Sequence, residues 1–333
     1  MKRIFFISIL ICTILLTGCS KYNEKDIVKD LSKKYKNVSS YQVEGNMNIY
    51  NGDNNYKYEV TSSYEKGKYR VSLINKSTNN EQIILRNDDG VYVLNPKLNK
   101  SFKFQSDWPN NSSQVYLIKS IIKDLNKDNK VTMQEINNGY ILKCKVSYSN
   151  NKKLRNQKIY LTKKLDITKI EVFDKNSNIQ IRMKYNNLDT NAAFNNKYFS
   201  VDENMKSSLD VTEKEDEETS LLDETVYPMY LPDGTYLSNE ETVSKEEGER
   251  VILTFKGTSP FIIVEENAVR SKDTEVIPVY GEPTMLLDSV GAMSNNSVNF
   301  ISSGVEYYIA TENLSKEEIL NVVESINNIS SIK

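Results

Sequence analysis

The chain of 333 residues carries 43 basic and 45 acidic side chains, three cysteines and no histidine. Without histidine, Ser-His-Asp and Cys-His catalytic groups are excluded, and so is any zinc, copper or haem site that needs a histidine ligand. The length favours two domains over one large domain, and a hydrophobic share of 38% is sufficient to form a core.

Residues 1–18 have the pattern of a bacterial lipoprotein signal peptide. Two basic residues precede an apolar stretch from Ile4 to Leu16, which suits a signal peptide and is too short to span a bilayer. The stretch ends in Leu-Thr-Gly-Cys, a pattern that predicts cleavage after Gly18 and attachment of lipid to Cys19. We therefore expect a protein anchored on the outer face of the bacterial cytoplasmic or spore membrane. A secreted protein with an incidental cysteine is the alternative.

Charge is distributed unevenly along the chain. Residues 19–201 have a net charge of +14, residues 202–224 of −8 and residues 225–333 of −10. A basic half tethered at its own N-terminus is expected to be attracted to anionic lipid or wall polymers, although dispersed, solvated lysines are the alternative. Nucleic acid is not expected as a partner outside the membrane.

Residues 19–201 are expected to form the first domain, in which a helix precedes antiparallel strands. Residues 23–38 place apolar side chains on one helical face behind an asparagine cap. Apolar and polar residues then alternate with a period of two, and residues 87–90 have the sequence of a hairpin turn. A second helix capped by Ser112 or Ser113 follows, and strands resume after it.

Cys144 is the one cysteine that remains free in the expected mature chain. Cys12 leaves with the signal peptide and Cys19 carries the lipid, so no intramolecular disulfide can form. Leu142, Cys144 and Val146 share one face of a predicted strand. This pattern favours a small buried hydrophobic side chain, with a reactive thiol as the alternative.

Residues 202–226 are expected to form an acidic linker, because they contain few apolar residues and the acidic run 213–218. A calcium site is the alternative there, but the segment lacks the spacing of an EF-hand loop. Residues 227–333 are expected to form a small α+β domain. Its strands precede a final amphipathic helix, for which Ser315 and Glu318 supply a capping box.

No P-loop, GxGxxG, GxSxG or CxxC motif occurs, and the adjacent carboxylates Asp88 and Asp89 suit a turn better than acid–base catalysis. We therefore expect no enzyme, no cofactor and no metal site. A curved sheet with helices on its concave face leaves an apolar groove where the helices do not fill it. Residues on the apolar stripes are candidates for such a groove, or for an ordinary core: Val43, Met47, Tyr69, Val71, Leu85, Tyr92 and Trp108.

Residues 82–125 resemble the LolA-like lipoproteins of endospore-forming bacteria, the sporulation and germination lipoproteins that include a GerS-like branch. The resemblance extends more loosely over residues 19–201. It implies an α+β fold with a LolA-like curved antiparallel half-barrel, capping helices and no catalytic activity. Residues 227–329 resemble the small C-terminal domain of RseB/MucB regulators, in the order of their strands, the Leu-Pro-Asp-Gly opening and the final helix.

Two functional hypotheses follow from these features. The first is a membrane-anchored binding or scaffold lipoprotein of the cell or spore envelope, whose partner protein is a spore-cortex amidase if the resemblance to germination lipoproteins extends that far. The second is a carrier or sensor that holds a lipid, an acyl chain or a lipopeptide in the groove. LolA itself is a soluble shuttle, whereas lipid on Cys19 prevents this chain from leaving its membrane.

Overall fold

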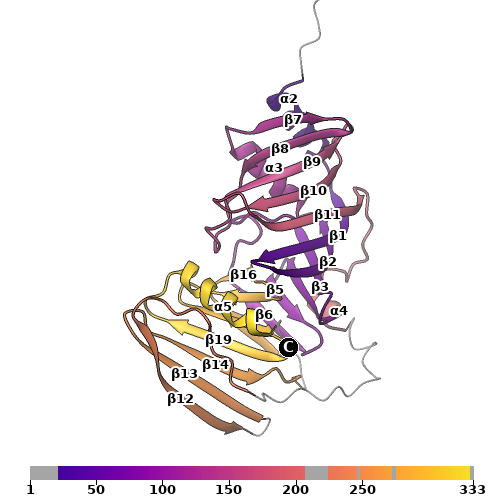
Figure 1. Ribbon diagram of the computed structural model, residues 1–333. Helices are drawn as coiled ribbons and strands as arrows, with labels where there is room; N and C mark the ends of the chain where they lie inside the picture. Colours follow the sequence, from indigo (N-terminus) through magenta and orange to yellow (C-terminus); the bar gives the residue numbers. More distant parts are fainter. Residues whose placement is uncertain (1–21, 207–223, 246–247, 272–274, 331–333) are drawn as a thin grey trace, which may run out of the picture.

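The computed structural model describes residues 22–206, 224–245, 248–271 and 275–330, so Gly18, Cys19 and the predicted signal peptide lie outside the described residues. The described chain forms a twelve-stranded sheet and a seven-stranded sheet (Figure 1). The strands of its first half are β1 (Ser40–Asn51), β2 (Asn54–Glu65), β3 (Lys68–Asn75), β4 (Glu81–Asn87), β5 (Gly90–Asn95), β6 (Lys100–Phe104), β7 (Thr132–Ile136), β8 (Gly139–Lys145), β9 (Asn156–Thr162), β10 (Ile167–Phe173) and β11 (Ile179–Asp189).

The second half of the chain supplies the seven-stranded sheet and one strand of the first sheet. Its strands are β12 (Thr235–Lys245), β13 (Gly248–Gly257), β14 (Phe261–Asn267), β15 (Glu275–Val279), β16 (Glu282–Met285), β17 (Val290–Met293), β18 (Ser297–Ser302) and β19 (Val305–Thr311). The helices are α2 (Glu24–Lys36), α3 (Ile118–Lys127), α4 (Val201–Lys206) and α5 (Lys316–Ser330).

The first sheet is curved and open (Figure 1). Its strand order is β15-β6-β5-β4-β3-β2-β1-β11-β10-β9-β8-β7, so the sheet does not close into a barrel within the described ranges. A bulge interrupts the β1–β11 register at Gly45, where a Cβ atom would lie 2.1 Å from the carbonyl oxygen of Lys184. Bulges of this kind bend a sheet. The predicted α+β fold with a curved antiparallel half-barrel is confirmed.

The main core lies between the concave face of this sheet and the helices α2 and α3. Ile27 and Leu31 of α2 and Ile121 of α3 are fully buried against it. Burial of these side chains is the largest favourable contribution to the docking of both helices. Trp108 is also fully buried, with its ring centroid 6.0 Å from that of Tyr69.

The N-termini of the first two long helices differ from each other. Asn23 caps α2, and its side chain accepts from the backbone N–H of Asp26, as expected. The expectation of a serine cap on α3 is wrong, because that helix begins at Ile118 without a side-chain cap. Ser113 Oγ instead donates to Asp124 Oδ1 at 3.0 Å, which pins the preceding loop to the middle of the helix.

The second sheet has the order β12-β13-β14-β19-β18-β17-β16 and packs one face against α5 (Figure 1). Ile319, Val322 and Val323 of the helix are fully buried in that core. The predicted capping box is present, because Ser315 N donates to Glu318 Oε2 at 2.8 Å and Glu318 N donates to Ser315 Oγ at 3.3 Å.

A third, smaller core covers the outer face of β4 and β5. Phe199 and Met205, the latter on α4, pack there. Residues 201–206, where the acidic linker was expected to begin, are thus a short helix, whereas residues 207–223 lie outside the described residues.

Cys144 is buried in the main core, and burial raises the pKa of its thiol to about 12. The prediction of a small buried hydrophobic side chain is confirmed.

Candidate binding site at the junction of the two sheets

Strand β15 joins the two halves of the chain. It runs parallel to β6 at the edge of the first sheet, with Ile277 opposite Phe102 and Val279 opposite Phe104. The backbone N–H of Gln105 continues the ladder by donating to the carbonyl oxygen of Val279 at 3.2 Å. The second half of the chain therefore covers a sheet edge that would otherwise present unpaired backbone groups.

Residues 285–292, here termed the plug segment, enter the half-barrel beyond that strand. Leu287, Val290 and Ala292 belong to the same apolar core as the concave face of the first sheet. Tyr58 of β2 donates its hydroxyl to the carbonyl oxygen of Leu287 at 3.0 Å. The plug segment thus occupies one part of the concave face, and α2 and α3 cover another.

Gln82 of β4 holds the plug segment by pairing with both backbone polar groups of one residue, Val290. Its Nε2 donates to the carbonyl oxygen of Val290 at 3.2 Å, and its Oε1 accepts from the backbone N–H of Val290 at 2.6 Å. Both residues are buried. The glutamine amide therefore replaces the strand that would otherwise satisfy these two backbone groups.

A cavity of about 130 Å³ lies next to the plug segment, where the two halves of the chain meet. Strands β1 and β11 line it from the first half, and α5 and the start of the plug segment line it from the second. Its apolar lining consists of Ile49, Leu154, Ile181, Pro283, Met285, Leu286, Leu287, Leu320 and Val323. The cavity exists only while the two halves are docked, because both supply its walls.

Polar contacts beside the cavity connect the two halves. Asn150 Nδ2 donates to Thr284 Oγ1 at 2.6 Å, and its Oδ1 accepts from Lys316 Nζ at 2.8 Å. Lys153 forms an ion pair with Glu324 of α5 at 2.9 Å. A buried amide that uses both its donor and its acceptor fixes the relative position of the groups that it joins.

Two carboxyl groups at the junction have raised pKa values. Burial raises the pKa of Asp288 in the plug segment to about 6, although Ser302 donates a hydrogen bond that opposes the shift. Burial also raises the pKa of Glu282 above its ordinary value, against hydrogen bonds from Ser149 and Asn111. Loss of water around each carboxylate is the dominant cause in both cases.

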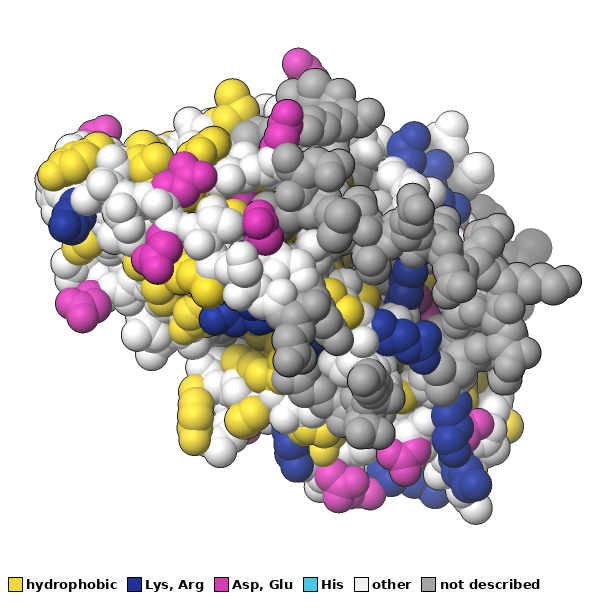
Figure 2. Space-filling model, turned by 90° about the horizontal axis from the view of Figure 1, so that it is seen from below, with side chains coloured by type: hydrophobic (Ala, Val, Ile, Leu, Met, Phe, Trp, Pro, Cys, Tyr) yellow, Lys and Arg dark blue, Asp and Glu magenta, His cyan; other side chains and the backbone are white. Residues whose placement is uncertain are grey.

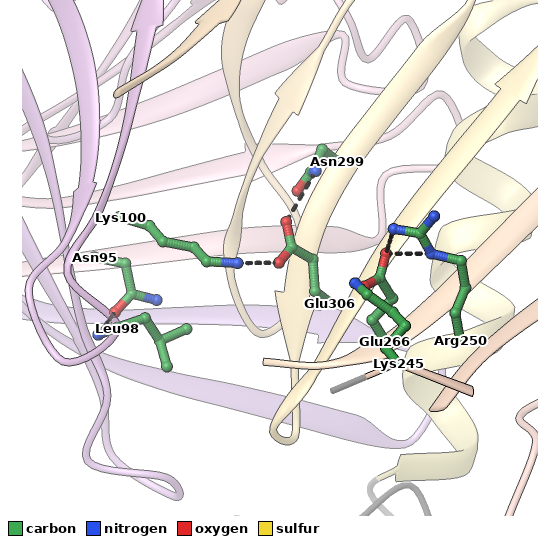
Figure 3. A network of polar contacts seen from close by, with 8 residues as sticks. All are labelled: Asn95, Leu98, Lys100, Lys245, Arg250, Glu266, Asn299 and Glu306. Carbon is green, nitrogen blue, oxygen red and sulfur yellow. Dashed lines mark hydrogen bonds and ion pairs between the residues drawn. The ribbon is translucent and has the colours of Figure 1, made fainter. Parts of the chain in front are cut away.

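A third connection crosses from β6 to the second sheet (Figure 3). Lys100 forms an ion pair with Glu306 of β19, and Asn299 Nδ2 donates to the other oxygen of that carboxylate at 3.1 Å. The two charged side chains are only 12% and 17% exposed. Further along the same sheet, Arg250 holds Glu266 through a hydrogen bond of 2.8 Å.

Five of the seven groove candidates lie together in the main core. They are at most 7% exposed and belong to one cluster on the concave side: Val43, Met47, Tyr69, Val71 and Trp108. Leu85 and Tyr92 lie instead in the small core on the outer face, against Phe199. None of the seven lines the junction cavity.

Sequence reasoning did not identify the plug segment or Gln82. The short apolar run Met285-Leu286-Leu287 is the one signal that points to burial, but its period matches neither a helix nor a strand with one wet face. The pairing of Gln82 with Val290 joins residues 208 positions apart, and no local pattern encodes it.

No cluster of three or more Asp, Glu or Cys side chains that could hold a metal ion is found in the described part of the chain. Among the same residues, no helix is both long and apolar enough to cross a membrane.

The open curved sheet, its two helices and the second sheet locked to its edge define an α+β protein built on a half-barrel. The amino-acid sequence also identifies the protein family. The chain belongs to the YdcC-like sporulation protein family, whose pattern matches residues 1–199. It is 35% identical over 325 residues to sporulation protein YdcC of Bacillus subtilis (strain 168), covering 97% of this chain and 96% of that protein.

Several solved structures are similar at low sequence identity. The complex of MucA and MucB from Pseudomonas aeruginosa matches with 12% identity and a TM-score of 0.34, covering 89% of this chain and 97% of that chain. A putative outer membrane lipoprotein-sorting protein domain from Vibrio parahaemolyticus matches with 7% identity and a TM-score of 0.28, covering 88% and 91%. A LolA superfamily protein from Nitrosomonas europaea matches with 10% identity and a TM-score of 0.25, covering 88% and 93%.

Proposed function

We propose that this sporulation-family protein is a membrane-anchored, non-catalytic lipoprotein of the cell or spore envelope that binds a partner protein. Cleavage after Gly18 would leave Cys19 as the first residue of the mature chain. Lipid attached to Cys19 would then hold the protein on the outer face of the membrane. The sequence of the signal segment supports the anchor. A spore-cortex amidase is the partner that the resemblance to germination lipoproteins implies.

The observation that carries this proposal is the filling of the concave face by the chain itself. Leu287, Val290 and Ala292 pack where an open half-barrel would present apolar surface. Pockets that bind whole small molecules have volumes of roughly 300–1,000 Å³. The junction cavity of about 130 Å³ is smaller, and its size suits one apolar side chain from a partner. Single anchoring side chains in pockets often dominate the affinity of protein interfaces.

The test fills the cavity without changing charge. Met285 lines the cavity and is half-buried, so Met285→Trp places a larger side chain there. Met229 is 74% exposed, and Met229→Trp is the matched control. We expect Met285→Trp to reduce recovery of a cross-linked cortex amidase from sporulating membranes at least about tenfold, which corresponds to about 1.4 kcal/mol of binding free energy. Equal recovery with both folded variants would exclude the cavity as the partner site.

The anchor is tested separately. Cys19→Ser should abolish incorporation of an alkynyl fatty acid and release the protein from membranes, because two or more acyl chains are needed for stable anchoring. Incorporation that continues in the variant would refute the lipid assignment.

The alternative function, a carrier or sensor for an acyl chain or lipopeptide, requires the plug segment to leave the half-barrel. Native mass spectrometry of the detergent-free protein distinguishes the two functions. A co-purifying acyl ligand would favour the carrier, and the mass of the protein alone would favour the partner-binding lipoprotein.

A further inference from the structure

The outer face of β8 to β11 carries two rows of basic side chains. One row crosses the four strands in order and consists of Lys143 on β8, Lys158 on β9, Glu171 on β10 and Arg182 on β11. Each residue lies directly opposite the next. Side chains of directly paired residues point to the same face of a sheet. This row is therefore shared by four strands and contains three cations and one carboxylate.

The second row runs beside the first. Tyr160 lies opposite Lys169, and Lys169 lies opposite Lys184. Lys145 extends the basic surface at the end of β8, where its side chain is exposed. Like charges placed directly opposite one another destabilise a sheet. The pair Lys143–Lys158 therefore carries a cost that an anionic surface would relieve, whereas the charge of Lys169 is partly offset by Glu171.

Glu171 neutralises only part of this surface, because its single negative charge is shared between two cations. It is fully engaged with its neighbours, at 3.0 Å from Lys169, 2.9 Å from Arg182 and 2.8 Å from the hydroxyl of Tyr160. Lys143, Lys145 and Lys184 are exposed, and none of them forms an ion pair with another described residue.

The chain enters the fold at β8, on the face of that strand opposite to Lys143, because Tyr140 packs with the main core. Tyr22, the first described residue, packs its ring 5.7 Å from the ring of Tyr140 on β8. Tyr22 is the third residue after Cys19, and an extended chain of that length spans at most about 11 Å. A lipid on Cys19 would therefore hold β8 close to the membrane surface.

The opposite end of the molecule has the opposite charge. In Figure 1 the second sheet lies at the far end from α2 and β7, and residues 225–333 have a net charge of −10. Figure 2 looks at that end, and acidic and hydrophobic side chains gather on its left side, where few basic ones are seen. An anionic membrane would attract the end with the β8–β11 face and repel the other.

From these observations we infer that the outer face of β8 to β11 docks on an anionic lipid surface. The inference rests on the proposed function for the anchor that brings β8 close to the membrane, but the contact itself is electrostatic and does not need the lipid. Screening limits the attraction to about 8 Å at physiological salt, so only charges near the surface contribute. Lys143, Lys145 and Lys184, which project from the face, are those charges.

The experiment uses the mature chain from Ser20, which lacks the lipidated cysteine and so separates this contact from the anchor. Sedimentation with phosphatidylcholine vesicles containing phosphatidylglycerol should recover the protein at about 0.05 M salt and lose it at about 0.5 M salt. Vesicles of phosphatidylcholine alone should recover little. Replacing Lys143, Lys145 and Lys184 by glutamate should weaken binding at least about tenfold.

The matched control replaces by glutamate three exposed lysines that lie away from this face: Lys197, Lys206 and Lys256. It has the same net charge as the test variant, and circular dichroism verifies that both are folded. Retained binding by the control supports the inference. Equal loss in both variants, binding that does not depend on phosphatidylglycerol, or binding to a soluble wall polymer but not to vesicles would overturn it. Fatty-acid labelling at Cys19 tests the lipid anchor separately. The anchor and the electrostatic docking can therefore fail independently of each other.

Discussion

The pairing of Gln82 with Val290 predicts how firmly the second half of the chain is held in the half-barrel. Gln82→Met keeps the length of the side chain and removes its amide. The backbone N–H and C=O of Val290, a residue that is 3% exposed, then lose both of their partners. The plug segment keeps its apolar contacts, so the variant isolates the contribution of the two hydrogen bonds.

The magnitude follows from the two orphaned groups. Each buried donor or acceptor left without a partner costs about 1–3 kcal/mol. Partial relaxation toward water lowers the sum, and we expect a total of about 3 kcal/mol. This corresponds to roughly a hundredfold increase in the equilibrium for opening the plug segment.

Hydrogen exchange of a peptide spanning residues 285–293 measures that opening directly. We expect the amide of Val290 to exchange about a hundredfold faster in Gln82→Met, together with a lower midpoint of urea unfolding. Gln134 is exposed on β7, and Gln134→Met is the control for the substitution itself. Equal exchange and equal midpoints in the two variants would refute the role assigned to Gln82.

Two further predictions follow from buried ionisable groups. Burial raises the pKa of Glu265 from 4.5 to about 7. The folded state thus binds this proton more tightly than the unfolded state, so stability falls as pH rises between those values. Glu265→Gln should flatten that slope in urea unfolding, and an unchanged slope would contradict the assignment. Cys144, whose pKa burial raises to about 12, should not react with an aromatic disulfide until guanidinium unfolds the chain. Rapid reaction in buffer would show that the core opens there.

The proposed functions use different parts of the molecule. The junction cavity is built from both halves of the chain and would receive a partner side chain. The basic face of β8 to β11 lies on the outside of the first sheet and would contact lipid. A partner bound at the junction would therefore be held at the membrane without competing for the surface that faces it.

The sequence alone determined features that depend on neighbours a few residues apart. Period-two alternation predicted most strands of the first sheet, the Asn87-Asp-Asp-Gly90 turn predicted the β4–β5 hairpin, and the Asn23 and Ser315 caps predicted two helix starts. Strand β12 was missed because its sequence is largely polar, and its side chains are exposed on both faces.

The face on which an apolar residue lies could not be predicted where both faces are apolar. Strands β4 and β5 contain consecutive apolar residues, so periodicity does not distinguish Ile84, which faces the main core, from Leu85, which faces α4. Five groove candidates lie on one side and two on the other for this reason. The cores were thus predictable in composition, and their division between the two faces was not.

Only the tertiary structure decided how the two halves of the chain meet. Strand β15 belongs to the second half of the chain, but its pairing with β6 rather than within the second sheet depends on a free edge far away in the sequence. Likewise, no local pattern predicts where the plug segment docks, because its position against the concave face depends on Gln82, Tyr58 and the apolar core that it enters. Local sequence patterns indicate which side chains of a segment can be buried. Which distant segment packs against them is decided only in the folded chain, where several segments compete for the same apolar surface and sheet edges.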